Sequence, residues 1–253
     1  MQPETMKDQR MAKRIKNYKI HRLLGHGNSA EVHLATEIQS GRQVALKLLH
    51  AFITDQKVKD NFLHEADIIR RLQHSSIVRV LDADFDDTRP FLVLTYAPNG
   101  NLRKKYPRTT VLPNNDILNY ARNIGQALEY AHQQDIIHRD VKPENILLNE
   151  RNAPLLSDFG IARIAQHTLT QSTQQPAGTP IYAAPEQLMG KPKKASDQYS
   201  LAIMIYEWLC GRPHLRAMIL PGSMMPIVTR RSPRYANAIQ RFPSPSKKSC
   251  SGP

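Results

Sequence analysis

Two polar motifs in the middle of the chain, HRDVKPEN at 138–145 and SDFG at 157–160, constrain the fold more than any other feature. They place an acid, an amide and a second acid, Asp140, Asn145 and Asp158, within one short stretch. In an enzyme acting on an alcohol, Asp140 could accept the hydroxyl proton. Asn145 and Asp158 offer the oxygen ligands that Mg²⁺ prefers when it bridges phosphates. The fold must therefore bring these three side chains to one site.

In this order and spacing, the two motifs resemble the catalytic and metal-binding loops of the eukaryotic-type (Hanks-type) serine/threonine protein kinases, in a bacterial-like form. The resemblance covers about residues 18–213. It implies an α+β, bilobal fold, with a β-rich N-lobe that holds one key helix and a mainly helical C-lobe. It also implies ATP and Mg²⁺ as cofactors, and a protein substrate with serine or threonine as partner.

A glycine-rich loop is the first part such a fold needs, and LLGHGNSAEVHLA at 23–35 places Gly25 and Gly27 two residues apart. Glycine lets the backbone approach phosphate without a Cβ in the way. Alone, Gly-x-Gly often marks only a turn. Ala30 stands where the family usually has a third glycine, which departs from the commonest pattern.

A lysine inside an apolar strand is costly unless it is paired, and VALKLL places Lys47 in such a run. The resemblance makes Lys47 the residue that holds the α- and β-phosphates, with Glu65 as its partner. The spacing of residues 61–74 predicts an amphipathic helix, with Glu65 on its apolar stripe. The stripe consists of Phe62, Ala66, Ile69 and Leu72. Two plainer alternatives stay open: Lys47 could reach solvent from its strand, and Glu65 could be solvated at the stripe's edge.

The segment FLVLTYAPNGNL at 91–102 resembles the hinge between two lobes, with Leu94 at the gatekeeper position. Backbone groups from Thr95 to Ala97 would bond adenine, so the threonine that replaces the family's usual acid costs little. The cofactor-binding residues implied by the resemblance are Leu24, Gly25, His26, Gly27, Asn28, Ser29, Ala30, Val32, Ala45, Lys47, Leu94, Thr95, Ala97, Asn145, Leu147 and Asp158.

The C-lobe is indicated by an amphipathic pattern over 113–134 and by GTPIYAAPE at 178–186, which resembles the end of an activation segment. Residues 196–208 resemble a buried helix opened by a Ser-Asp cap. In the family, the acid at Asp197 bonds back to the catalytic loop; the alternative is that Asp197 only caps the helix. His132 and His138 fit packing roles better than metal-ligand roles.

Lys142, two residues after the candidate base, is typical of the serine/threonine branch. The catalytic set that the resemblance implies is Asp140, Lys142, Lys47, Glu65 and Thr179, and the metal ligands are Asn145 and Asp158. Arg139 matches an arginine that commonly pairs with a phosphorylated activation loop. The candidate phosphorylation sites are Thr168, Thr170, Ser172 and Thr173. A Gln/Ser/Thr-rich loop could equally be just polar and mobile.

The net charge of +13 and the pI near 9.9 suggest nucleic-acid binding, but the charge is at the two ends. Residues 1–20 carry +4 and residues 211–253 carry +8, which leaves +1 for the body between them. No nucleic-acid partner is therefore expected.

The chain begins without the apolar run of an export signal, and no stretch approaches the roughly 18 apolar residues of a membrane span. Two cysteines are too few for a disulfide framework. We therefore expect a cytoplasmic protein without a membrane span, and the pattern leaves the oligomeric state open.

The character of the sequence changes after Pro213, where the family's later C-lobe helices are expected. The rest has no acid, seven prolines counted from Pro213 and no sustained period. The sequence thus divides into a basic N-terminal extension (1–17), a kinase domain (18–213; N-lobe 18–96, C-lobe 97–213, incomplete after the 196–208 helix) and a basic, Pro-rich, disordered tail (214–253).

The tail has two open explanations. Read one base out of frame, permitted codons for 241–253 give ISQPVEEVVLRA, an acidic amphipathic helix that resembles the family's continuation. We therefore hypothesise a single-base frame change near codon 213, which one read of the source DNA would test; the alternative is a genuine divergent tail.

Two functions from different classes remain. The first is ATP-dependent phosphorylation of serine or threonine hydroxyls on proteins by a signalling kinase. The second is a catalytically inactive, truncated kinase-like product that at most binds nucleotide or a protein partner.

Overall fold

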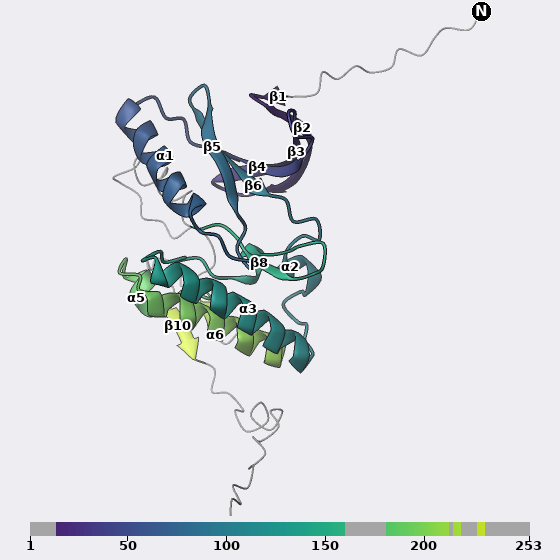
Figure 1. Cartoon of the computed structure of the whole chain (residues 1–253). Helices are drawn as coiled ribbons and strands as arrows, with labels where there is room; N and C mark the ends of the chain where they lie inside the picture. The colour runs from purple at the N-terminus through teal and green to yellow at the C-terminus, as the bar shows by residue number, and fades with distance from the viewer. Residues whose placement is uncertain (1–13, 160–180, 213–214, 219–226, 231–253) are drawn as a thin grey trace, which may run out of the picture.

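The structure, a computed structural model, describes residues 14–159, 181–212, 215–218 and 227–230. These residues form a curled β-sheet flanked by one long helix and, below it, a mainly helical lobe (Figure 1). The α+β, bilobal architecture predicted from the sequence is confirmed. Thr179 and the four candidate phosphorylation sites lie outside the described residues.

The upper lobe is built on a six-stranded antiparallel sheet with strand order β1-β2-β3-β4-β6-β5. Its strands are β1 (Arg14–Ile15), β2 (Tyr18–His26), β3 (Ala30–Glu37), β4 (Gln43–Leu49), β5 (Val80–Asp86) and β6 (Arg89–Thr95). Strand β1 begins before residue 18, the boundary expected for the domain, because Ile15 is buried in the core of the sheet.

Central strand β4 is buried on both faces, so its sequence reads as a nearly continuous apolar run. Between Val44 and Leu49, Lys47 is the one residue that is not fully buried. Its neighbours in register are Val32 on β3 and Leu92 on β6. The sheet therefore fixes the backbone of this lysine from both sides.

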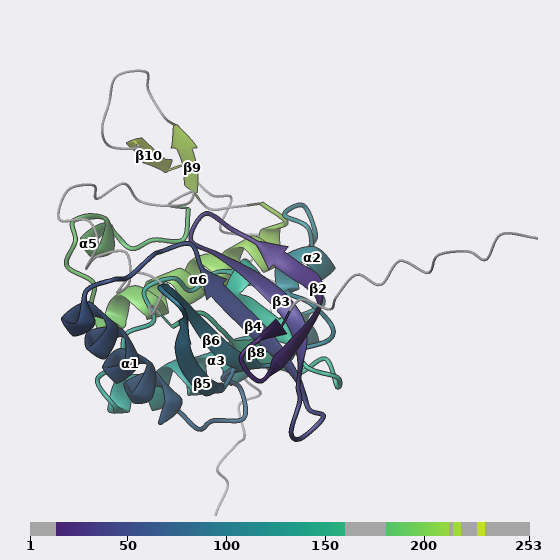
Figure 2. The same cartoon turned by 90° about the horizontal axis from the view of Figure 1, so that it is seen from above.

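Helix α1 (Gln56–Arg70) lies along the sheet beside β5 (Figure 2). The side chain of Asp55 caps it by accepting a hydrogen bond from the Val58 N–H at 3.0 Å. The predicted apolar stripe is confirmed, since Phe62, Ala66, Ile69 and Leu72 are buried. Burial of one large side chain such as Phe62 contributes about 1.5–3 kcal/mol. The helix begins five residues before the predicted segment and ends at Arg70.

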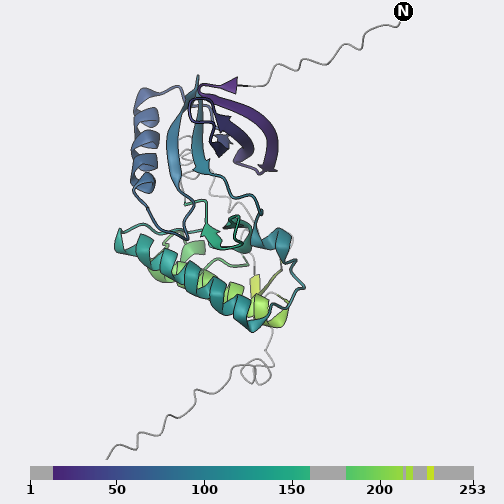
Figure 3. The ribbon, with the colours of Figure 1, turned by 45° about the vertical axis from the view of Figure 1, so that its right-hand side comes forward.

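The lower lobe contains α2 (Leu102–Lys105), α3 (Asn114–Gln133), a 3₁₀ turn η1 (Pro143–Asn145), β7 (Ile146–Leu148), β8 (Pro154–Leu156), α5 (Pro185–Leu188) and α6 (Lys194–Cys210). Helices α3 and α6 run side by side (Figure 3), and the rings of Tyr120 and Trp208 meet with centroids 6.0 Å apart. The β7–β8 hairpin separates the catalytic motifs, so the two loops that bear them lie at the same end of the hairpin.

Two short strands, β9 (Leu215–Met218) and β10 (Ile227–Arg230), form an antiparallel pair after α6. They fall in the segment for which the sequence pattern predicts no regular structure, so for these residues the structure differs from that expectation. The β-branched run Ile227, Val228, Thr229 favours a strand, although it is too short to give a period.

No helix among the described residues is long and apolar enough to span a membrane.

Candidate active site

The lysine of β4 and the aspartate of the SDFG motif meet where the two lobes join. Lys47 Nζ forms an ion pair with Asp158 Oδ1, and the Lys47 side chain is only 11% exposed. Burial acts to raise the pKa of the Asp158 carboxyl, but the Lys47 ammonium outweighs it and holds the pKa below its ordinary value. Asp158 is therefore a carboxylate at neutral pH.

The catalytic loop folds around the carboxylate of Asp140. Lys142 Nζ donates to Asp140 Oδ2 at 2.7 Å, and Asn145 Nδ2 donates to the same oxygen at 2.9 Å. Asn145 Nδ2 also donates to the Asp140 main-chain carbonyl at 2.8 Å. Both side-chain bonds end on Oδ2, so within these contacts Oδ1 remains available to a substrate hydroxyl.

A buried aspartate on α6 holds the catalytic loop from below. The Asp197 carboxylate is fully buried and accepts the N–H groups of His138 and Arg139, each at 2.8 Å. His132 Nε2 lies 2.7 Å from Asp197 Oδ2. The role implied by the resemblance is thus met geometrically, because Asp197 bonds to the loop directly. Helix α6 begins two residues before Ser196, whose hydroxyl accepts the Lys193 N–H at 2.9 Å.

His138 packs inside the loop. Its Nε2 lies 2.7 Å from the Ser157 carbonyl oxygen, and the Asp140 N–H points to its Nδ1 at 3.2 Å. A carbonyl can only accept and an N–H can only donate, so the neutral ring protonated at Nε2 satisfies both. Burial lowers the pKa of His138, against the raising effect of the Asp197 carboxylate. This histidine connects Ser157 of the SDFG motif to the main chain of Asp140, which is a packing role.

Two residues of the site have left-handed backbone conformations that only glycine adopts freely. Arg139 has φ 67° and Asp158 has φ 65°. Such conformations cost about 1–3 kcal/mol for most side chains and are found preferentially at active sites. Arg139 directly precedes Asp140, and Asp158 itself carries a carboxylate of the candidate site.

The donor set fits a magnesium ion. The amide nitrogen of Asn145 is engaged by Asp140, so its oxygen is the atom left for a cation, and Asp158 supplies an ionised carboxylate. No three His, Cys, Asp or Glu side chains converge on a common point among the described residues.

The glycine-rich loop and the apolar cluster at the hinge are compatible with the predicted nucleotide, whereas one hinge donor is not. A Cβ added at Gly25 would meet nothing within 4 Å, and at Gly27 only the Ala30 carbonyl at 3.8 Å, so the loop surface is open. At the hinge, Ala97 packs with Leu94 and Leu147 in one apolar cluster that Val78 and Leu155 complete. The Thr95 N–H is bonded to the Arg79 carbonyl at 3.0 Å, so this donor is not available to adenine.

The expected pair of Lys47 with Glu65 is not formed. Both residues are described, Glu65 is half-buried on α1, and no ion pair joins it to Lys47 in the described part of the chain. The ammonium instead pairs with Asp158. Of the remaining predicted site residues, Leu24, Val32 and Ser29 are half-buried, Ala30 and Ala45 are buried, and His26 and Asn28 are exposed.

Sequence reasoning missed a buried cluster around Arg103 of α2. Arg103 donates to both carboxylate oxygens of Glu207, at 2.8 and 3.2 Å, and to Glu144 Oε1 at 3.1 Å. The Tyr182 hydroxyl bonds both Arg103 and Glu207. Burial, followed by the Glu207 carboxylate, raises the pKa of Tyr182. The one available signal was Glu207, an acid inside an apolar helix run.

Glu186, the last residue of the segment GTPIYAAPE, has a polar partner on α6. Its Oε1 accepts a hydrogen bond from the Ser196 hydroxyl at 2.5 Å. This bond lowers the pKa of Glu186. The side chain is therefore not an uncompensated buried charge.

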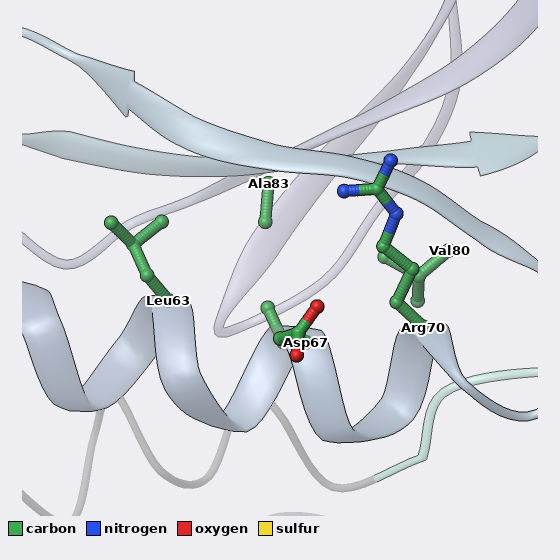
Figure 4. Close-up of a pocket in the computed structure, with 6 residues that line it drawn as sticks. Leu63, Asp67, Arg70, Val80 and Ala83 are labelled. Carbon is green, nitrogen blue, oxygen red and sulfur yellow. The ribbon is translucent and has the colours of Figure 1, made fainter.

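A hollow of about 200 Å³ lies between α1 and β5 (Figure 4). It is lined by Leu63, Ala66, Asp67, Arg70, Val80 and Ala83, none of which belongs to the predicted site.

Comparison with known proteins agrees with this geometry. The protein kinase domain family model matches residues 18–250. The serine/threonine-protein kinase PknB of Mycobacterium leprae is 39% identical over 203 residues, which cover 78% of this chain and 33% of that protein. A probable serine/threonine-protein kinase of Clostridium acetobutylicum is 33% identical over 197 residues, which cover 77% of this chain and 30% of that protein. The 3-phosphoinositide-dependent protein kinase 1 of Rattus norvegicus is 35% identical over 219 residues, covering 85% and 39%. The chain thus spans about a third of the length of these bacterial relatives.

Proposed function

The chain belongs to the protein kinase family, and we propose that it transfers the γ-phosphoryl group of ATP to serine or threonine hydroxyls of proteins. Two side-chain pairs from three separate segments support the proposal, Lys47 with Asp158 and Asn145 with Asp140. The two motifs are joined by Ser157, whose N–H and hydroxyl both donate to the Asn145 carbonyl, at 2.9 and 3.0 Å.

Asp140 is the proposed base. Its Oδ1 accepts the proton of the substrate hydroxyl, while Lys142 and Asn145 hold Oδ2 and so fix the carboxylate plane. The hydroxyl oxygen forms a bond to the γ-phosphorus, the bond from that phosphorus to the β-bridging oxygen breaks, and ADP leaves. Lys142 lies beside this path as a cation near the transferred group.

The remaining residues bind and orient. Lys47 holds the α- and β-phosphates, the glycine loop covers them, and the apolar cluster of Leu94, Ala97 and Leu147 receives the adenine. Asn145 and Asp158 would hold Mg²⁺. When bound, this cation neutralises charge that develops on the phosphate oxygens.

Serine/threonine preference rests on Lys142 and on the names of the bacterial relatives. Thr179, the proposed contact of both Asp140 and Lys142, lies outside the described residues, as do the candidate phosphorylation sites. We assign Arg139 to pairing with a phosphorylated residue in that segment. Its main-chain carbonyl is held by Gln187 Nε2 at 2.6 Å.

Phosphotransfer from labelled ATP to a generic protein substrate tests the proposal, with the full chain and Asp140→Asn compared. We expect the variant to lose at least about 100-fold in turnover, because a positioned base contributes about 10²–10⁴-fold. Asp135→Asn is the matched control, since Asp135 is exposed just after α3 and its carboxylate bonds only Lys194, at 2.6 Å, among the described residues.

Equal turnover in the wild type and in Asp140→Asn would refute the role of Asp140. ATP-dependent thermal stabilisation of the wild type without any turnover would support the inactive, nucleotide-binding product.

A further inference from the structure

We propose that His50 is a positioning residue that fastens the tip of the glycine-rich loop to strand β4. The inference rests on the proposed function, because it assigns the loop to ATP phosphates. His50 directly follows β4 and belongs to none of the predicted motifs.

Three contacts join His50 to the loop tip. Its main-chain N–H donates to the Ser29 carbonyl at 2.9 Å, and its Nδ1 lies 3.2 Å from the Asn28 carbonyl oxygen. A carbonyl oxygen only accepts, so Nδ1 carries the proton in this bond. The His50 ring also packs on the His26 ring, with centroids 5.3 Å apart and planes inclined at 42°. The side chain therefore contacts the end of β2 and the turn that follows it.

Among the described residues, Ala30 beside the tip pairs with Leu49 of β4, but residues 27–29 belong to no strand pair. Pairing of β2 with β3 stops at His26 and Glu31, and inside the turn the Gly27 N–H bonds the Ala30 carbonyl at 2.9 Å. A Cβ on Gly25 would face open space, and one on Gly27 would meet only the Ala30 carbonyl oxygen, at 3.8 Å. Such a loop loses conformational entropy when it closes on a ligand. A contact that orders it beforehand reduces that loss.

His50 also sets where the loop is held. It lies three residues after Lys47 and directly follows β4, a strand that is paired on both sides. Fastening the tip to this point fixes the loop amides relative to the Lys47 ammonium. Both groups are proposed to bind the same phosphate chain, so their spacing bears on ATP affinity and not on the Asp140 proton transfer.

The test compares His50→Ala, His50→Phe and the control His21→Ala in the full chain. His21 is an exposed histidine of β2 whose Nε2 lies 2.7 Å from Thr36 Oγ1. We expect His50→Ala to raise the KM for ATP about 3- to 10-fold, the effect of losing one ring contact and one hydrogen bond. The kcat should change by less than about twofold. His50→Phe keeps the ring contact but loses the hydrogen bond, so its KM for ATP should lie between those of the wild type and His50→Ala.

A second readout needs no catalysis. In nucleotide-free protein, amide hydrogen exchange of residues 26–29 should be faster in His50→Ala than in the wild type and unchanged in His21→Ala. The melting temperature of every variant is measured as well. A general loss of stability in His50→Ala would count against the proposal, because the changes in KM and exchange would then not be specific to the loop.

If His50→Ala matches His21→Ala in KM and exchange while the wild type transfers phosphate, His50 has no positioning role and the proposed function stands. If the wild type neither binds ATP nor transfers phosphate, both proposals fall.

Discussion

Replacing Arg103 with methionine should cost about 3–5 kcal/mol of unfolding free energy, because it removes one partner of a buried ion pair. Glu207 is only 1% exposed, and its carboxylate receives two bonds from the guanidinium. Methionine fills similar space but donates nothing, so Glu207 would stay buried beside Glu144 without a cation. Such a loss is a large part of the roughly 5–15 kcal/mol that stabilises a typical domain.

The direction of this expected change in unfolding free energy follows from the charge on Arg103. Burial acts to lower the pKa of this guanidinium, but the bonds to Glu207 outweigh burial and raise it. Arg103 therefore stays charged throughout the accessible pH range.

Urea unfolding of the full chain, followed by far-UV circular dichroism, measures the effect. Arg71→Met is the control: Arg71 pairs with Asp67 at 3.0 Å on the exposed side of α1, and such a pair is worth about 0.3–0.5 kcal/mol. The double variant Arg103→Met/Glu207→Leu removes both buried charges and should recover most of the loss. A cost below about 1 kcal/mol for Arg103→Met, or no recovery in the double variant, would contradict a buried ion pair.

Two further predictions concern His138 and Gly211. The pKa of buried His138 is lowered from 6.5, so the unfolded chain binds more protons below that pH, and stability should fall from pH 7 to 5.5 by at most about 1.4 kcal/mol per pH unit. Asp158, whose pKa is lowered from 3.8, loses its stabilising effect only at lower pH. His138→Gln should therefore flatten the dependence of stability on pH between pH 7 and 5.5. A flat wild-type profile over this window would contradict a buried neutral ring. Gly211→Ala should destabilise by more than about 1 kcal/mol, because Gly211 has φ 66° and a Cβ would lie 2.9 Å from Val111 Cγ2. Thermal melts compare this variant with Gly190→Ala, because Gly190 has φ 77° but open space where the Cβ would lie. Equal losses of stability in the two variants would show that the contact with Val111 contributes nothing.

The elements that could be predicted from the sequence are those defined by local pattern. The apolar spacing of Phe62, Ala66 and Ile69 indicated α1, because helix period alone places these side chains on one face. The geometry around Asp140 and Asn145 was also accessible, since these residues are five apart in one loop. In both cases the interacting groups are close in the chain.

The Arg103 cluster could not be predicted because its partners are far apart in the chain. Arg103 and Glu207 are separated by 104 residues, and neither lies in a pattern that points to the other. An acid in the apolar run of α6 indicates only that some cation must approach it. Which cation does so depends on how α2 packs against α6, and that is a property of the whole lobe.

The partner of Lys47 shows a different limit. An apolar strand with one lysine requires a carboxylate nearby, and the sequence contains two that suit, Glu65 on α1 and Asp158 in the second motif. The structure selects Asp158, while α1 leaves Glu65 half-buried without a bond to the lysine. The choice depends on the placement of a helix relative to a sheet, which side-chain chemistry does not determine. It also has a consequence for the site, because Lys47 and a divalent cation are both positive and both need the Asp158 carboxylate. A bound cation would therefore compete with the Lys47 ammonium for this carboxylate, and an ammonium displaced from it would be available to phosphate.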